Sequence, residues 1–206
     1  AKDKVNSQLS DLNLVALYTC PWPGQGFYFN KAVNSSADTQ GIKFRSYNSA
    51  TATFAEELGM VPVQVEAAEL SQALATGVAE SFISSGSTGY DRKVWESLTH
   101  YYKVNAWLPR NYVIINKGVW EGLGADTKAS VQKAADETGA ACSAKSAELA
   151  NWYFEQLSAN GMSVEDASSD FLAELEAIGA KMTVDWLAAA GADGQAIIDN
   201  YKANAN

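Results

Sequence analysis

The chain has 206 residues, of which 47% are hydrophobic and 19% are charged, an ordinary composition for a globular protein of one domain or two small lobes. Its formal net charge of −9 argues against nucleic acid as a partner, because binding to phosphates requires a basic surface. No apolar run approaches the roughly 20 residues that span a bilayer, so we expect no stable membrane insertion.

The first half of the chain alternates short apolar runs with amphipathic stretches. The runs predict strands at residues 13–20, 27–29, 42–46, 61–65 and 78–85, and the stretches between them predict helices at 34–41, 49–59 and 67–77. Repeated strand–helix–strand units of this length favour a mostly parallel sheet with helices on its faces. In such a sheet, ligands bind at the carboxyl ends of the strands.

The second half begins with an aromatic-rich segment that ends in a strand, "NYVIINK", at 111–117. One long helix is predicted for residues 126–159, which at 1.5 Å per residue would extend roughly 50 Å, more than the width of a small lobe. A helix of that length suggests a strut that crosses two lobes. Two further amphipathic helices are predicted at about 167–189 and 193–204, and "GADG" breaks the pattern between them.

The sequence contains no catalytic or metal-binding motif. His100 is the only histidine, and no local pattern places it beside Cys20 as the base of a thiol nucleophile. "GSTG" at 86–89 has neither the lysine of a phosphate-binding loop nor the spacing of a nucleophile elbow. We therefore expect no enzyme, no metal and no cofactor. For Cys20 and Cys142, the only cysteines, we expect two separate buried thiols, with a disulfide as the alternative.

Arg45 stands near the carboxyl end of the predicted strand 42–46, immediately before a predicted helix. Asn48 or Ser49 is the expected N-cap of that helix, so its unsatisfied N–H groups and positive dipole end lie beside the guanidinium. Both features attract an anion, and a guanidinium matches a carboxylate through two parallel hydrogen bonds. A surface ion pair with a neighbouring acid is the alternative for this arginine.

Two further groups of residues belong to the same predicted sheet edge. Ser84, Ser85 and Ser87 follow a strand and offer neutral donors and acceptors to an oxygen-rich ligand, although turn formation explains them equally well. Aromatic side chains near strand ends suit the wall of a small-molecule pocket, although core packing is the simpler explanation for each of them. These aromatics are Trp22, Phe27, Tyr47, Tyr90, Trp107 and Tyr112.

Four stretches, at 36–78 (with "GIKFRSYNSATATFAEELG"), 103–123 ("KVNAWLPRNYVIINKGVWEGL"), 150–162 and 186–201, together resemble one family. The chain resembles the solute-binding proteins of tripartite ATP-independent periplasmic (TRAP) transporters, the DctP-like family. The resemblance covers nearly all of residues 10–204 in order.

The resemblance implies an α/β, two-lobed periplasmic-binding-protein-like fold of the class II type, with a long helix that spans both lobes. The first lobe would comprise 1–22 and 111–150, and the second 23–110 and 151–206. Because members of the family begin with a βαβ-rich region that this chain lacks before residue 1, we expect the first lobe to be incomplete, and the chain to expose apolar sheet edge and to bind its ligand weakly on its own.

The resemblance also implies that the protein captures a small organic carboxylate in the periplasm and delivers it to TRAP membrane subunits for sodium-coupled uptake. Arg45 matches the arginine that clamps the ligand carboxylate, and Asn48 follows it as in many members. Gln25 stands where members that bind sialic acid have an arginine, Ala68 where some have an aromatic, and Ser85 where many have an asparagine. These departures favour a small monocarboxylate, aromatic or 2-oxo, over a sialate.

The predicted ligand-binding residues are Arg45, Asn48, Ser85, Ser84, Gln25, Trp22, Phe27 and Trp107. The alternative functions are a binding module of another class, such as an ABC-type receptor or a ligand-sensing domain, and an enzyme built on the same architecture.

Overall fold

The computed structural model describes residues 2–204. Its strands are β1 (Leu14–Pro21), β2 (Gln25–Phe29), β3 (Lys43–Ser46), β4 (Val61–Gln64), β5 (Ser81–Ser84), β6 (His100–Trp107), β7 (Arg110–Asn116) and β8 (Ser163–Asp166). Its α-helices are α1 (Lys2–Asp11), α2 (Ser49–Glu57), α3 (Leu70–Ala75), α4 (Gly86–Asp91), α5 (Lys117–Gly122), α6 (Ala125–Ala159) and α7 (Ser169–Asn204). Three 3-10 helices, η1 (Ser36–Thr39), η2 (Ala67–Glu69) and η3 (Val94–Glu96), complete the list.

Six strands form one sheet, in the order β4-β3-β5-β2-β6-β8. β3 pairs in parallel with β4 and β5, and β6 pairs in parallel with β8. β2 runs antiparallel to both of its neighbours, β5 and β6. The sheet is therefore mixed, and the expectation of a mostly parallel sheet was too simple. The direction of β2 depends on the strands beside it, which its short apolar run does not reveal.

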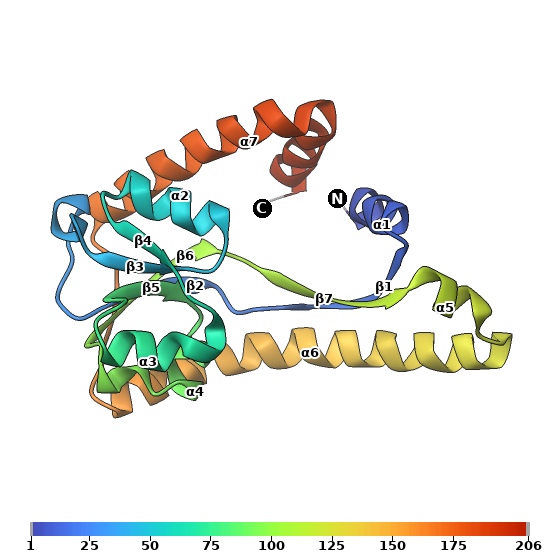
Figure 1. Cartoon of the computed structure of the whole chain (residues 1–206), viewed down its shortest axis with the longest axis horizontal. Coiled ribbons are helices and arrows are strands. Elements are labelled where there is room, and N and C mark those ends of the chain that lie inside the picture. Colours follow the sequence, from blue (N-terminus) through green and yellow to red (C-terminus); the bar gives the residue numbers. More distant parts are fainter. Residues whose placement is uncertain (1, 205–206) are drawn as a thin grey trace.

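The hydrophobic core lies on both faces of this sheet because side chains alternate along each strand. On one face, Phe27 and Phe29 of β2 and Phe44 of β3 pack with Phe54 of α2 and Phe171 of α7. On the other face, the core consists of residues of α3, α6 and the neighbouring strands, among them Tyr28, Phe82, Tyr101, Leu70 and Leu157. Figure 1 shows α2 and α7 above the sheet and α3, α4 and α6 below it.

β1 and β7 form a separate antiparallel sheet of two strands, paired from Leu14 opposite Asn116 to Pro21 opposite Arg110. α6 packs against α4, β8 and β1: its residues Tyr153 and Phe154 meet Gly86 of α4, whereas Gly139, earlier in the helix, meets Tyr18 of β1. It therefore runs from the six-stranded sheet along the two-stranded one (Figure 1), as the strut predicted from its length.

Cys20 of β1 and Cys142 of α6 form a disulfide, with their Cα atoms 5.6 Å apart. The expectation of two separate thiols was therefore wrong. The two residues are 122 positions apart in the sequence, so only the packing of β1 against α6 brings them together. The disulfide links the two-stranded sheet covalently to α6.

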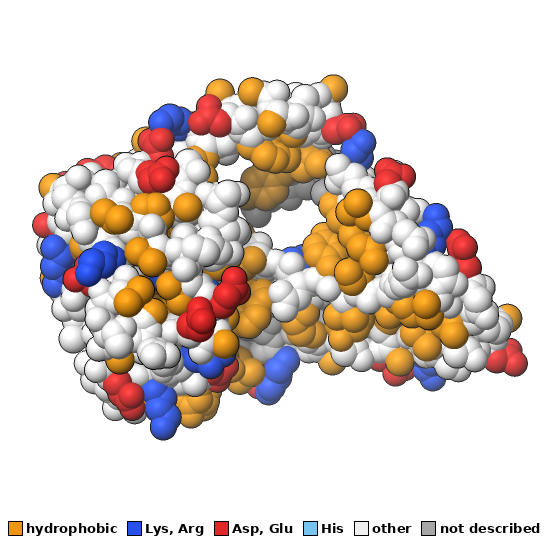
Figure 2. Space-filling model, viewed as in Figure 1, with side chains coloured by type: hydrophobic (Ala, Val, Ile, Leu, Met, Phe, Trp, Pro, Cys, Tyr) orange, Lys and Arg blue, Asp and Glu red, His pale blue; other side chains and the backbone are white. Residues whose placement is uncertain are grey.

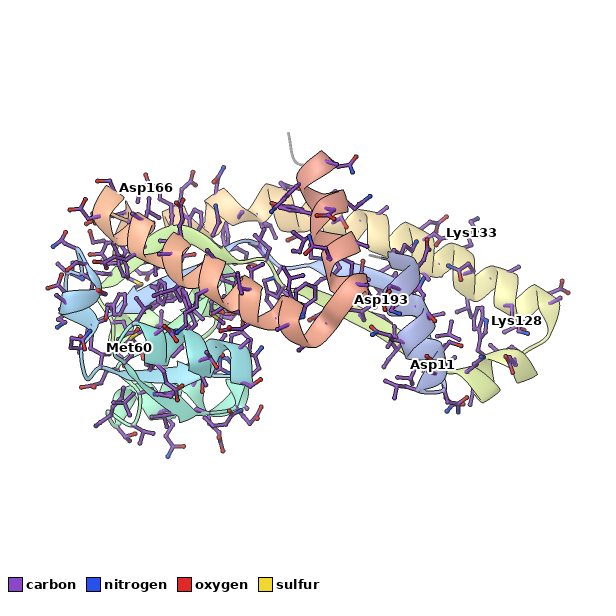
Figure 3. All side chains as sticks on the ribbon, turned by 90° about the horizontal axis from the view of Figure 1, so that it is seen from above. Asp11, Met60, Lys128, Lys133, Asp166 and Asp193 are labelled. Carbon is purple, nitrogen blue, oxygen red and sulfur yellow. A yellow bond between two sulfur atoms is a disulfide. The ribbon has the colours of Figure 1, made fainter. Side chains whose placement is uncertain are left out.

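α7 bends at Gly191, whose backbone is not helical (φ 60°, ψ −145°). The bend falls in "GADG", where the sequence predicts a break between two helices. Beyond it, Asp193 forms an ion pair of 2.5 Å with Lys4 of α1, and Figure 3 shows Asp193 where α7 approaches α1. No helix within residues 2–204 is both long and apolar enough to cross a membrane.

Sequence patterns missed α4, α5, β6 and β8. α4 lies within "SSGSTGYD", whose serines and glycines are more typical of a turn. β6 follows a polar stretch and holds the adjacent aromatics Tyr101 and Tyr102, so alternation of apolar and polar residues is absent from it. α4 and β6 nevertheless both contribute to the sheet edge at which the site residues meet.

Candidate ligand-binding site

One edge of the six-stranded sheet collects most of the predicted site residues. β3 and β5 end at this edge, with Arg45 in register with Phe82, and antiparallel β2 begins there, with Gly26 opposite Ser84. β6 also ends there, with Trp107 opposite Gln25. Because β2 runs against its neighbours, it brings Gln25 from its amino end to the carboxyl ends of β3 and β5.

Arg45 is buried, with only 5% of its surface exposed. Its Nε donates a 2.8 Å hydrogen bond to the carbonyl of Val65, and its guanidinium carbon lies 5.2 Å from the centre of the Tyr47 ring. None of the ion pairs within residues 2–204 involves Arg45. The alternative of a surface ion pair therefore does not describe this arginine.

The electrostatics of Arg45 favour a bound anion. Burial lowers the pKa of Arg45, and the nearby Tyr47 and Glu66 oppose that shift. A guanidinium nevertheless stays protonated in proteins, so the positive charge persists with little solvent around it. A buried charge without an ionic partner is costly, and a carboxylate that enters would remove much of that cost.

Asn48 caps α2, as predicted. Its Oδ1 accepts a 2.8 Å hydrogen bond from the backbone N–H of Thr51, and the Thr51 hydroxyl accepts from the N–H groups of Asn48 and Tyr47, each at 3.2 Å. The cap thus holds the segment that follows Arg45. The side-chain oxygen Oδ1 of Asn48 is used by this cap, and its side-chain NH₂ group forms no hydrogen bond within residues 2–204.

Gln25 and Tyr47 are joined by a hydrogen bond. The Tyr47 hydroxyl donates to Gln25 Oε1 at 2.9 Å, and 6% of Gln25 is exposed. Burial raises the pKa of Tyr47, although Arg45 and the hydrogen bond to Gln25 oppose that shift, so the phenol keeps its proton and remains the donor. The sequence grouped Tyr47 only with other aromatics, because nothing in its spacing from Gln25 signals this pair.

The serines lie beside the same edge, and the hydroxyls of Ser85 and Ser87 are engaged with each other. Ser85 is fully buried, and its Oγ lies 2.8 Å from Oγ of Ser87. The Ser85 carbonyl also accepts a 2.9 Å hydrogen bond from the Tyr28 hydroxyl. Ser84 is 6% exposed. Ser84 and Ser85 stay predictions as ligand contacts.

The three predicted aromatic contacts lie in different surroundings. Phe27 is fully buried in the core, among the rings of Phe29, Phe44, Phe54 and Phe171, and as a ligand contact it stays a prediction. Trp22 is 40% exposed, and its Nε1 donates to Asn111 Oδ1 at 3.0 Å.

Trp107 contacts Phe54 and lines an apolar cavity of about 690 Å³ between α2, the β6–β7 connection and α7. The cavity walls include Met182, Trp186 and Ile198, and Figure 2 shows hydrophobic side chains on the inner sides of the central hollow. Arg45, Gln25 and Tyr47 do not line this cavity. Trp107, which lies opposite Gln25 in the sheet, is the predicted ligand-binding residue that does line it.

No group of three or more His, Cys, Asp or Glu side chains within residues 2–204 is arranged to hold a metal ion. The donors at the sheet edge are instead a guanidinium, two side-chain amides, a phenol and hydroxyls. Hydrogen-bond donors around a guanidinium are chemically suited to an organic anion.

Comparison with protein families gives one match over most of the chain. A family model described as "Bacterial extracellular solute-binding protein, family 7" (DctP) matches residues 2–188. The curated C4-dicarboxylate-binding periplasmic protein DctP of Rhodobacter capsulatus is 31% identical over 110 residues, which are 53% of this chain and 33% of that protein.

Solved structures give similar folds. A TRAP solute-binding protein of an unidentified marine microbe, specific for pyroglutamate and crystallised with it, is 82% identical, with a TM-score of 0.95 over 98% of this chain. DctP6 of Bordetella pertussis, an extracytoplasmic solute receptor that binds pyroglutamic acid, is 39% identical, with a TM-score of 0.96 over 98% of this chain. The present chain spans 66% and 67% of those two chains and a third of the curated relative.

Proposed function

Because the chain belongs to the DctP family of bacterial extracellular solute-binding proteins, we propose that it captures pyroglutamate in the periplasm for a TRAP transporter. The observation that carries this proposal is Arg45, a buried guanidinium at the sheet edge that forms no ion pair within residues 2–204. A ligand carboxylate supplies the missing anion through two parallel hydrogen bonds. The family consists of binding proteins, so no reaction is expected.

The choice of ligand rests on similarity together with the residues that depart from sialate-binding members. The marine protein that is 82% identical is specific for pyroglutamate, and the Bordetella receptor binds the same acid. Pyroglutamate is a small monocarboxylate, as the departures from sialate-binding members suggest. It is neither aromatic nor a 2-oxo acid, so we propose it in place of those two classes.

In this proposal Arg45 binds the carboxylate, and Asn48 and Ser84 donate further hydrogen bonds to it. Trp22 and Trp107 cover the ring of the ligand from the connections beside β2 and β6. Phe27 supports the site from the core. TRAP membrane subunits receive the ligand, and sodium ions drive its uptake.

We also propose the two-lobed division at the predicted boundaries, with 1–22 and 111–150 in the first lobe and 23–110 and 151–206 in the second. The separate β1–β7 sheet supports it. The ion pair of Lys4 with Asp193 then connects the two lobes, because Lys4 belongs to the first lobe and Asp193 to the second.

Calorimetric titration of the full-length protein with L-pyroglutamate tests the function. We expect saturable binding to the wild type, and a loss of affinity of about 30-fold or more in Arg45→Gln, since removing one partner of a buried charged pair costs about 2–5 kcal/mol. Lys43→Gln is the matched control, because Lys43 lies on the same strand, is exposed and donates to the Gly77 carbonyl. Equal affinities for the wild type and Arg45→Gln would refute the proposal.

A further inference from the structure

Gln25 occupies an unusual position for an amide side chain. It is the first residue of β2, it is 6% exposed, and its only side-chain hydrogen bond within residues 2–204 is the one that its Oε1 accepts from Tyr47. A glutamine amide has two N–H donors besides its oxygen. Both donors of Nε2 therefore lack a partner within the part of the chain that the structure describes.

These free donors remain accessible. The single side-chain polar atom that is fully enclosed without a hydrogen bond within residues 2–204 is Oγ of Ser81. Nε2 of Gln25, which also forms no hydrogen bond there, is consequently in contact with the surroundings. A nearly buried donor that keeps a small opening is suited to a ligand atom.

Tyr47 connects this amide to the carboxylate-binding arginine. Its hydroxyl donates a hydrogen bond to Gln25 Oε1. The centre of its ring lies 5.2 Å from the guanidinium carbon of Arg45. Its own position is set by the α2 cap, through the bond of its backbone N–H to the Thr51 hydroxyl. Tyr47 therefore contacts both the cationic group of Arg45 and the amide group of Gln25.

We propose that Gln25, oriented by Tyr47, donates a hydrogen bond to the ring carbonyl of the ligand while Arg45 holds its carboxylate. This inference rests on the proposed function and adds the basis of its selectivity. The site then selects five-membered lactam acids over carboxylates of the same shape that lack the amide. An analogue without the carbonyl leaves the Gln25 donors desolvated and unpaired, which is the strongest way for a site to reject a close isostere. Gln25 contacts the ligand directly, and Tyr47 is a positioning residue.

The test compares two ligands on three forms of the full-length protein. Cyclopentanecarboxylate has the ring and the carboxylate of pyroglutamate without the amide. Calorimetry on the wild type should show a preference for pyroglutamate of at least about 100-fold. Gln25→Met, which keeps the length of the side chain, should reduce that preference about 10-fold or more by weakening only pyroglutamate. Tyr47→Phe, which keeps the ring under Arg45, should lower the preference less strongly, also without weakening cyclopentanecarboxylate.

Several outcomes overturn the inference. An unchanged preference in Gln25→Met, or an equal loss of affinity for both ligands, would show that the amide of Gln25 does not bind the ring carbonyl. If Gln25→Met does not fold, an unchanged preference in Tyr47→Phe refutes the inference, and a reduced preference supports it. A wild type that binds pyroglutamate without preference defeats this inference alone, whereas a wild type that binds neither acid defeats the proposed function as well.

Discussion

Cys20 and Cys142 are joined by a disulfide that closes a loop across the fold, from β1 to the long helix α6. The two residues are 122 positions apart, and their Cα atoms are 5.6 Å apart. A cross-link between such distant residues restricts the unfolded chain strongly. Disulfides persist in oxidising compartments, which agrees with the periplasmic location that we propose.

Replacement of both cysteines by serine should lower the free energy of unfolding by about 2–4 kcal/mol, because the unfolded chain regains the entropy that the cross-link removes. Urea unfolding of the oxidised wild type and of the double variant measures this difference. Reducing agent should destabilise the wild type and leave the double variant unchanged. An equal response of both proteins to reducing agent would show that the bond does not form in solution.

The sequence predicted the elements whose pattern is local, and missed those that depend on distant partners. Arg45 was placed correctly because both the end of β3 and the Asn48 cap of α2 are visible within a few residues. The pairing of Cys20 with Cys142 is not encoded in local spacing, since it requires β1 and α6 to pack together. The bond between Gln25 and Tyr47 was also missed, because it depends on the antiparallel direction of β2.

Two buried tyrosines should make the protein sensitive to alkali. Burial raises the pKa of Tyr28 and of Tyr101 above the ordinary value of 10.0. The folded protein thus keeps both phenol protons at pH values where the unfolded chain loses them, and unfolding releases protons. The free energy of unfolding should be insensitive to these groups below about pH 10 and fall above it by about 1.4 kcal/mol per pH unit for each tyrosine.

Urea unfolding from about pH 9 to about pH 11 measures this slope. Tyr101→Phe removes one of the two groups, so its slope should be shallower than that of the wild type. The same slope in both proteins would contradict a role for Tyr101 in the alkaline transition.

Ser81 should tolerate loss of its hydroxyl. Its Oγ is enclosed and forms no hydrogen bond within residues 2–204, so the folded protein bears the cost of desolvating it. Ser81→Ala should leave the free energy of unfolding unchanged or raise it by up to about 1 kcal/mol. Thermal and urea unfolding measure the change.

Thr39 offers the matched control, since its buried hydroxyl lies 2.6 Å from the Leu58 carbonyl and 2.8 Å from the Ser36 carbonyl. Thr39→Val keeps the shape and removes these hydrogen bonds, so it should cost about 1–2 kcal/mol. A larger loss in Ser81→Ala than in Thr39→Val would mean that the Ser81 hydroxyl has a partner in solution.

The bend in α7 should depend on glycine at position 191. Gly191 has φ of 60° and ψ of −145°, a conformation that strains any residue with a Cβ atom. Gly191→Ala should lower the free energy of unfolding by about 1–3 kcal/mol, or straighten the helix and separate Asp193 from Lys4.

Gly179→Ala is the control in the same helix, because its backbone is helical and a Cβ atom there meets no atom within 4 Å. It should instead stabilise the protein by about 0.5–1 kcal/mol, as alanine does for glycine inside a helix. Urea unfolding of the two variants distinguishes these effects, and stabilisation by both would show that α7 does not require the bend.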